Sequence, residues 1–287
     1  MSANDRPVVV VYGNCQAQFI QLLTSEVPAL AELFSFVQVP STLPPGEPFP
    51  ELPEDVSRAA LVWEQYHQHH GLEPSEEFRS RLPANCEIVR YPGLNLMALW
   101  PFATLDERNV PEPRFPWGRY PFGDLVAIEV AQLGLPPRES FERYMERSRA
   151  QMPDLAQLVA RNRSILEARD AGCEVKMADF VFSNLTSTEQ FWAFGHLTSV
   201  VFAELISQLL ARSVHVLGDM DALVAAQLEA VFARFPAQGE TQLPIHPMVV
   251  EEIGLSFCEA NRLYRWFDHF WTFEEYMTRY IQLDATW

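Results

Sequence analysis

Cys15, in the stretch YGNCQAQ, is the side chain whose type and setting are best suited to covalent chemistry. It follows a β-branched run at residues 8–12, typical of a buried strand, and precedes a stretch at 16–23 with helical apolar spacing. The dipole and free amides of a helix start favour the thiolate, so we expect a depressed thiol pKa and a nucleophilic sulfur. Free cysteine is also common in protein cores, so the alternative is a residue that only fills space.

The neighbours of this cysteine suit a ligand-binding turn. Gly13 permits a tight turn and close ligand approach, and Asn14 tolerates unusual backbone angles while offering an amide donor. The Asn14 side chain and the backbone amides of Cys15 and Gln16 are therefore predicted to form an oxyanion hole. The glycine spacing matches neither the dinucleotide fingerprint nor the P-loop, which makes a Rossmann dinucleotide enzyme a poor fit.

A thiol nucleophile needs a base, and histidine is the first choice near neutral pH. His196 immediately precedes a helix predicted over residues 199–210 with Thr198 as its cap, so it is the preferred candidate. A purely structural role stays open for each histidine. The alternatives are three histidines that follow a predicted strand and one that precedes a proline at a helix start: His67, His69, His70 and His246.

The elements that must position these side chains form an α/β fold. Four strands with a helix at 75–82 predict a small parallel sheet, in which Cys15 lies at a carboxyl end, where ligands bind. We expect an α/β subdomain over residues 1–110 and a mainly helical one over 111–287, integrated into one domain with a loop-rich cleft between them. The strands are predicted at residues 8–12, 33–39, 59–63 and 87–91, and later helices at 125–133, 154–169 and 199–210. Asp124 is predicted to cap the helix at 125–133, and Thr272 with Glu275 to form a capping box before a last helix.

Composition excludes several classes of function. The chain has 287 residues, 48% of them hydrophobic, and a formal charge of −17, which disfavours nucleic acid and anionic membrane surfaces as partners. There is no apolar run of membrane-spanning length and no signal-peptide pattern, so we expect a cytoplasmic protein without membrane insertion. The four cysteines form no C-x-x-C pair, so neither a metal site nor a disulfide framework is predicted.

Several motifs together resemble the WcbI-type capsular polysaccharide biosynthesis proteins. They are VVVYGNCQAQ, the Trp-Pro-Phe step in ALWPFATLD, the YPFGD turn and the late histidine at a helix start, where Leu197 stands in place of the family's common proline. The resemblance implies a sheet-containing subdomain with a helical remainder, a loop-rich cradle for coenzyme A, and acetyltransferase activity. It carries over Gly13, Asn14, Cys15 and Gln16 as site residues.

The implied reaction moves an acetyl group from acetyl-coenzyme A to a sugar hydroxyl, with a histidine as base. Cys15 would either carry the acyl group or bind the thioester end, and the sequence leaves both routes open. The implied partners are an acyl donor, a saccharide acceptor and other polysaccharide biosynthesis proteins. In so acidic a chain the phosphates of coenzyme A need local positive charge. The candidates are Arg119, Arg161 and Arg163, with Trp117 or Tyr120 to stack on adenine.

Two other functions remain open from the sequence. A strand, Gly-Asn-Cys and helix resemble the nucleophile turn of SGNH-type esterases with cysteine in place of serine, which would make water the acyl acceptor. Alternatively, the protein binds coenzyme A or a glycan precursor without catalysis, and Cys15 serves only in packing.

Overall fold

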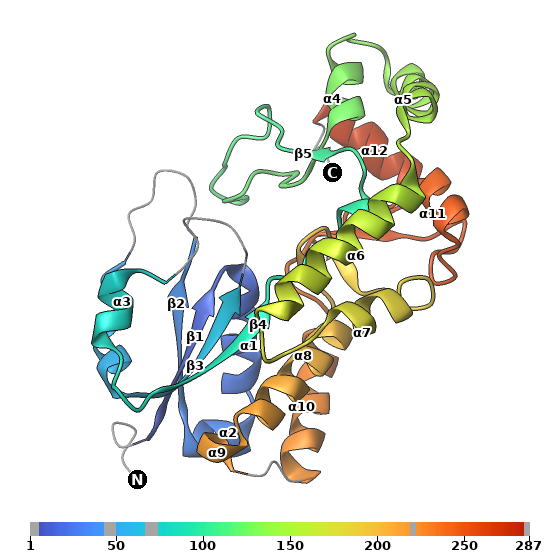
Figure 1. Cartoon of the computed structure of the whole chain (residues 1–287). Coiled ribbons are helices and arrows are strands. Elements are labelled where there is room, and N and C mark those ends of the chain that lie inside the picture. The colour runs from blue at the N-terminus through green and yellow to red at the C-terminus, as the bar shows by residue number, and fades with distance from the viewer. Residues whose placement is uncertain (1–5, 43–49, 67–73, 219–221, 284–287) are drawn as a thin grey trace. The chain divides into compact units, whose positions relative to one another are not determined.

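The computed structural model describes residues 6–42, 50–66, 74–218 and 222–283 (Figure 1). The chain divides into two compact units, each assembled from three separate segments. The sheet unit comprises Met1–Leu94, Arg163–Ser183 and Leu197–Gln238. The second unit comprises Asn95–Asn162, Asn184–His196 and Gly239–Trp287. This division differs from the expected single boundary near residue 110, because late segments of the chain join the N-terminal sheet.

A four-stranded parallel sheet in the order β2-β1-β3-β4 forms the centre of the sheet unit. All six residues of β1 are buried, as its valine run predicts for a strand covered on both faces. The prediction of a small N-terminal parallel sheet is confirmed. The strands are β1 (Val8–Gly13), β2 (Ser35–Pro40), β3 (Ala59–Tyr66) and β4 (Glu87–Pro92).

A parallel sheet must be covered on both faces. In the sheet unit the covering helices come from early and late segments of the chain. In this unit α8 contacts β4, and α10 contacts α1, α2 and α8. The Trp63 indole of β3 donates to Ser213 Oγ, just after α8, at 2.8 Å. The helices are α1 (Cys15–Ser25), α2 (Pro28–Leu33), η2 (Glu54–Arg58), α3 (Glu76–Arg81), α7 (Ala178–Ser183), α8 (Ser199–Arg212), α9 (Val214–Leu217) and α10 (Ala222–Arg234), while α6 (Leu155–Ala171) begins in the second unit and ends in this one.

The strand order places the candidate site. Since β1 lies between β2 and β3, the connections from β1 and from β3 leave the sheet in opposite directions, and ligands bind at such a switch point. The register pairs Tyr12 with Glu64, which puts Gly13 level with Gln65, and Gln65 pairs in turn with Tyr91. Three strands therefore present Gly13, Gln65 and Tyr91 in one row at the carboxyl edge of the sheet.

The second unit packs short helices and three two-stranded sheets around an aromatic-rich core. The predicted caps are observed: Asp124 caps α4, and Thr272 with Glu275 forms a capping box at α12. No helix among the described residues is long and apolar enough to cross a membrane. Its elements are η3 (Met97–Leu99), β5 (Ala103–Thr104), β6 (Gly123–Asp124), α4 (Leu125–Ala131), α5 (Pro137–Gln151), β7 (Phe191–Ala193), α11 (Pro247–Ile253), β9 (Tyr264–Trp266), β10 (His269–Trp271) and α12 (Phe273–Gln282), while β8 (His196–Leu197) begins in this unit and ends in the sheet unit.

Candidate functional site

Gly13 ends β1 in a backbone conformation that other residues rarely adopt, with φ of +155°. A Cβ built on it would lie 2.5 Å from Gln65 Oε1 and 2.9 Å from the Ala17 Cβ. The missing side chain therefore leaves the space that the Gln65 side chain occupies. Gly13 is required by this close approach as well as by its φ angle.

Asn14 is the N-cap of α1, and its Oδ1 accepts from the Gln16 backbone amide at 2.9 Å. The Asn14 backbone amide donates to Gln65 Oε1, also at 2.9 Å. The Asn14 side-chain oxygen thus holds the helix start, which fixes the direction in which Cys15 leaves the turn. This cap was not part of the sequence prediction, which gave Asn14 only a donor role.

The Gln16 side chain is a buried connector beneath the turn. Its Oε1 accepts from Gln65 Nε2 at 2.7 Å and from the Leu94 amide at 3.2 Å, while its Nε2 donates to the Leu94 carbonyl at 2.6 Å. These bonds tie α1, β3 and the segment after β4 together at the carboxyl edge of the sheet. Gln16 was predicted to touch the cofactor, but its side chain is engaged within the protein and supports the turn from below.

The Cys15 side chain is solvent-accessible, yet enough protein surrounds the sulfur to make the thiolate unfavourable. This desolvation raises the pKa of Cys15 above its ordinary value, although the Gln238 side chain and the backbone amides of Cys15 and Gln16 donate toward the sulfur and act in the opposite direction. The expected depressed pKa is therefore wrong. At neutral pH the thiol is protonated.

Among the described residues of the sheet unit, the buried side-chain atoms without a hydrogen-bond partner include Ser41 Oγ, Tyr91 Oη and Gln238 Oε1. Ser41 lies at the turn, where its amide donates to the Gly13 carbonyl at 2.9 Å. Burial raises the pKa of the Tyr91 phenol, and Cys15 lies near enough for the charge of its thiolate form to raise it further. The strand pattern placed Tyr91 at a carboxyl end, but no sequence signal marked Ser41 or Gln238.

His196 belongs to the second unit and is partly buried against Phe122, with ring centroids 4.9 Å apart in an edge-to-face arrangement. Its Nδ1 is buried without a partner among the described residues, and burial lowers the pKa of the imidazole to about 4. The ring is neutral at pH 7, with a lone pair that can accept a proton. Because Cys15 belongs to the sheet unit, the pairing of these two residues stays a prediction.

Among the other candidate histidines, His246 has a structural role. His246 is buried as the N-cap of α11, where Nδ1 accepts from the Met248 amide at 3.1 Å and Nε2 lies 2.9 Å from Ser148 Oγ. Both ring nitrogens are thus engaged, which leaves His246 no role as a base. His67, His69 and His70 lie outside the described residues.

Arg119 and Tyr120, which were predicted to bind coenzyme A, are engaged in contacts within the protein. Tyr120 is fully buried, with its ring against Trp266 and Tyr280, so its adenine-stacking role is wrong. Arg119 forms a two-point ion pair with Glu112, with Nε 2.7 Å from Oε1. Phe115 and Tyr120 belong to the aromatic-rich core of the second unit.

Of the remaining cationic and aromatic candidates, Trp117 is 60% exposed and has a ring face available for stacking. Arg163 pairs with Glu167 at 2.8 Å and with Asp179 at 3.5 Å on the surface of α6. Arg161, two residues earlier on the same helix, is exposed. Among the described residues, no group of three or more metal-binding side chains is arranged to hold an ion.

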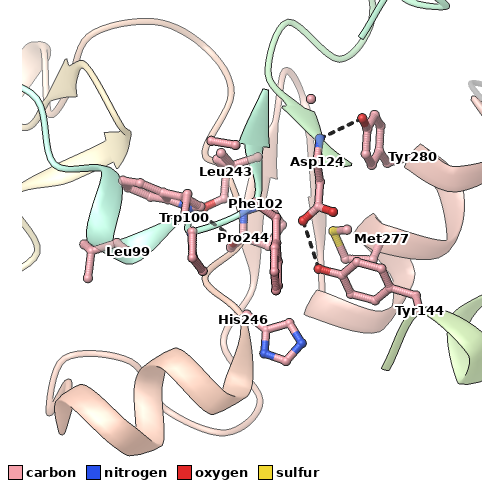
Figure 2. Close-up of a pocket in the computed structure, with 13 residues that line it drawn as sticks. Leu99, Trp100, Phe102, Asp124, Tyr144, Leu243, Pro244, His246, Met277 and Tyr280 are labelled. Carbon is pink, nitrogen blue, oxygen red and sulfur yellow. Dashed lines mark hydrogen bonds between the residues drawn. The ribbon is translucent and has the colours of Figure 1, made fainter. Parts of the chain in front are cut away.

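A small cavity of about 20 Å³ in the second unit is lined by Asp124, Tyr144 and Tyr280 among others (Figure 2). Asp124 Oδ2 accepts from the Tyr144 hydroxyl at 3.0 Å, and the Asp124 amide donates to Tyr280 Oη at 2.9 Å. Burial raises the pKa of Asp124 to about 6. The volume suits one water molecule and is far below that of a coenzyme site.

Together, the fold and the site define an α/β protein with an exposed cysteine at a helix start, at the switch point of a small parallel sheet. The model of the family described as polysaccharide biosynthesis enzyme WcbI matches residues 8–215. The chain therefore belongs to the WcbI family of polysaccharide biosynthesis enzymes.

A solved structure described as WcbI, a novel polysaccharide biosynthesis enzyme, matches with a TM-score of 0.70 and 16% sequence identity. The match covers 98% of this chain and 91% of that one, and it supports the fold. The structure is described as the native protein without a disulfide bond between coenzyme A and a cysteine. No curated protein matches the chain.

We predict that Gly13→Ala lowers the free energy of unfolding by about 2 to 4 kcal/mol, because the added Cβ displaces Gln65 and strains the backbone. The control is Gly195→Ala, where nothing lies within 4 Å of an added Cβ and the cost should stay within about 0.5 kcal/mol. Urea unfolding of the two variants measures the difference. Equal midpoints would contradict the close packing at Gly13.

A second prediction concerns Asp124, whose pKa in the folded protein is about 6, against about 3.9 when unfolded. The folded state then binds more protons between pH 4 and 6, so this residue makes the protein less stable as the pH rises through that window. The loss should be about 2 kcal/mol. Asp124→Asn, which retains a capping oxygen, should remove this part of the pH dependence in urea unfolding at pH 4.5 and 7. Parallel curves for the two proteins would show that Asp124 does not titrate as proposed.

Proposed function

We propose that this protein is a coenzyme A-binding acyltransferase that transfers an acetyl group from acetyl-coenzyme A to a sugar hydroxyl in surface or capsular polysaccharide biosynthesis. The observation that carries the proposal is the Gly13–Asn14–Cys15 turn at the switch point of the sheet, in a chain that belongs to the WcbI family. The description of the structural neighbour, which mentions coenzyme A and a cysteine, supports the choice of cofactor.

The residues around the turn fit the thiol end of coenzyme A. Close approach is possible because Gly13 has no side chain, and the site offers a buried hydroxyl and a buried carbonyl without partners, at Tyr91 and Gln238. Such unpaired groups are costly unless a ligand satisfies them. Cys15 would contact the sulfur end, and the amides that surround its sulfur would lie near the acyl oxygen.

Acetyl-coenzyme A supplies an acyl group already activated as a thioester, and the products are the sugar ester and free coenzyme A. The raised pKa of Cys15 favours the direct route, in which the sugar oxygen bonds to the acyl carbon and the Cys15 thiol only positions the donor. In the proposal His196 takes the proton of the hydroxyl, since its neutral ring has an unpartnered Nδ1. An acyl-cysteine route requires Cys15 first to lose its proton.

The phosphates of coenzyme A require cationic groups in a chain of formal charge −17. Arg161 is exposed and is the candidate that needs least rearrangement, whereas Arg119 would have to leave Glu112. Trp117 is the remaining aromatic surface for adenine. The proposal includes a cytoplasmic location, where acetyl-coenzyme A is available, and other polysaccharide biosynthesis proteins as partners.

If the proposal is correct, coenzyme A raises the melting temperature in proportion to the logarithm of its concentration, because it binds the folded state. The protein should consume acetyl-coenzyme A faster with a saccharide acceptor than without one. Cys15→Ser should keep the fold and the melting shift, while its turnover separates the routes: a several-fold loss fits direct transfer, and a complete loss fits an acyl-cysteine.

The same measurements test the other functions. Turnover independent of saccharide would indicate a hydrolase, and a melting shift without turnover would indicate a binding protein. The absence of a shift at millimolar coenzyme A would overturn the proposal.

A further inference from the structure

Gln238 follows α10 and has a fixed backbone within the sheet unit. Its amide donates to the Leu197 carbonyl at 2.9 Å, and the preceding residue, Ala237, forms a β-bridge with Thr198. Gln238 is only 6% exposed, although it lies in an irregular segment. A long polar side chain is thus held at a defined place beside the start of α8.

The two ends of this side chain have different surroundings. The NH₂ group donates toward Cys15 Sγ. The other end, Oε1, is buried and accepts no hydrogen bond from the described residues. A buried acceptor without a donor is destabilising. An unsatisfied oxygen at this position is therefore not expected of a residue that has only a structural role.

The carboxamide is planar and rigid, so the unsatisfied oxygen is a close neighbour of the Cys15 sulfur. A ligand that reaches this sulfur and carries an N–H group a few bonds away can donate to it. The thiol end of coenzyme A has this structure, because its sulfur is separated by two carbons from a secondary amide nitrogen. The Tyr91 hydroxyl, also unpartnered, is a donor in the same part of the sheet unit.

We propose that Gln238 binds the ligand at this site: Oε1 accepts the N–H of the secondary amide nearest the sulfur of coenzyme A, while the NH₂ group holds Cys15 Sγ. This inference rests on the proposed function, since it assumes a ligand whose sulfur end reaches Cys15. It adds a specificity determinant that selects an amide at a defined distance from the sulfur.

The test uses thiol–disulfide exchange with two small probes. One is the disulfide of N-acetylcysteamine, and the other is the disulfide of 2-mercaptoethyl acetate, which has an ester oxygen in place of the amide N–H. The Cys15 thiolate attacks one probe sulfur, a new S–S bond forms as the old one breaks, and the released thiolate takes up the proton that Cys15 lost. No further oxidant is needed. Mass spectrometry of the Cys15 peptide measures each rate.

Each rate is divided by that of the same probe with N-acetylcysteine, which removes the intrinsic reactivity of the disulfide. We expect the wild-type protein to prefer the amide probe by roughly 3- to 10-fold, the effect of one hydrogen bond. Gln238→Met should reduce this ratio to about 1. The control is Gln242→Met, a glutamine that is also 6% exposed but lies in the second unit, and it should retain the preference. Loosened packing alone would change both rates together and leave the ratio unaltered.

Equal ratios in the wild type and Gln238→Met, or a preference for the ester, would overturn the inference. Melting with coenzyme A keeps the two proposals distinguishable. If coenzyme A stabilises the protein and the ratios are equal, only the role of Gln238 fails. If coenzyme A gives no stabilisation while the amide preference depends on Gln238, the proposed function fails. Gln238 Oε1 then keeps its role as an acceptor for thiol ligands that carry an amide.

Discussion

The contact between Gly13 and the Gln65 side chain determines the geometry of the site. Gln65 occupies the space that any Cβ at residue 13 would need, and from there it holds the Asn14 amide and the Gln16 side chain. These two bonds fix the start of α1 against β3, and Gln16 extends the connection to Leu94 after β4. Cys15 itself makes few of these contacts, but its position follows from them.

The same arrangement explains why the thiol is neutral. A helix start with several inward-pointing amides favours the thiolate, but this effect is local and modest. The protein packed around Cys15 removes water from the sulfur, and this effect is larger. A neutral thiol beside unsatisfied polar groups is suited to contact a thioester. A cysteine that acts as a nucleophile would instead need the amide donors to outweigh desolvation, so that the thiolate is favoured.

The sequence predicts what depends on short-range pattern. The valine run of β1, the Asp124 cap and the capping box at Thr272 were identified from a few adjacent residues, and all are observed. Side-chain contacts and burial that depend on distant parts of the chain were not predicted. The role of Gln238 requires a segment after α10 to reach Cys15, and the pKa of Cys15 reflects all the surrounding atoms. Tyr120 was misassigned because the sequence of the YPFGD turn does not reveal whether its aromatic side chains are exposed or buried.

In the proposed complex the sulfur end of coenzyme A lies against Cys15. Chloroacetyl-coenzyme A tests it directly, since its electrophilic carbon is next to the thioester and alkylates a neighbouring thiol with loss of chloride. Peptide mapping should find modification at Cys15 well before Cys86, Cys173 or Cys258, and excess free coenzyme A should suppress it. Labelling of Cys86 or Cys258 at the same rate as Cys15, or labelling insensitive to coenzyme A, would contradict the account.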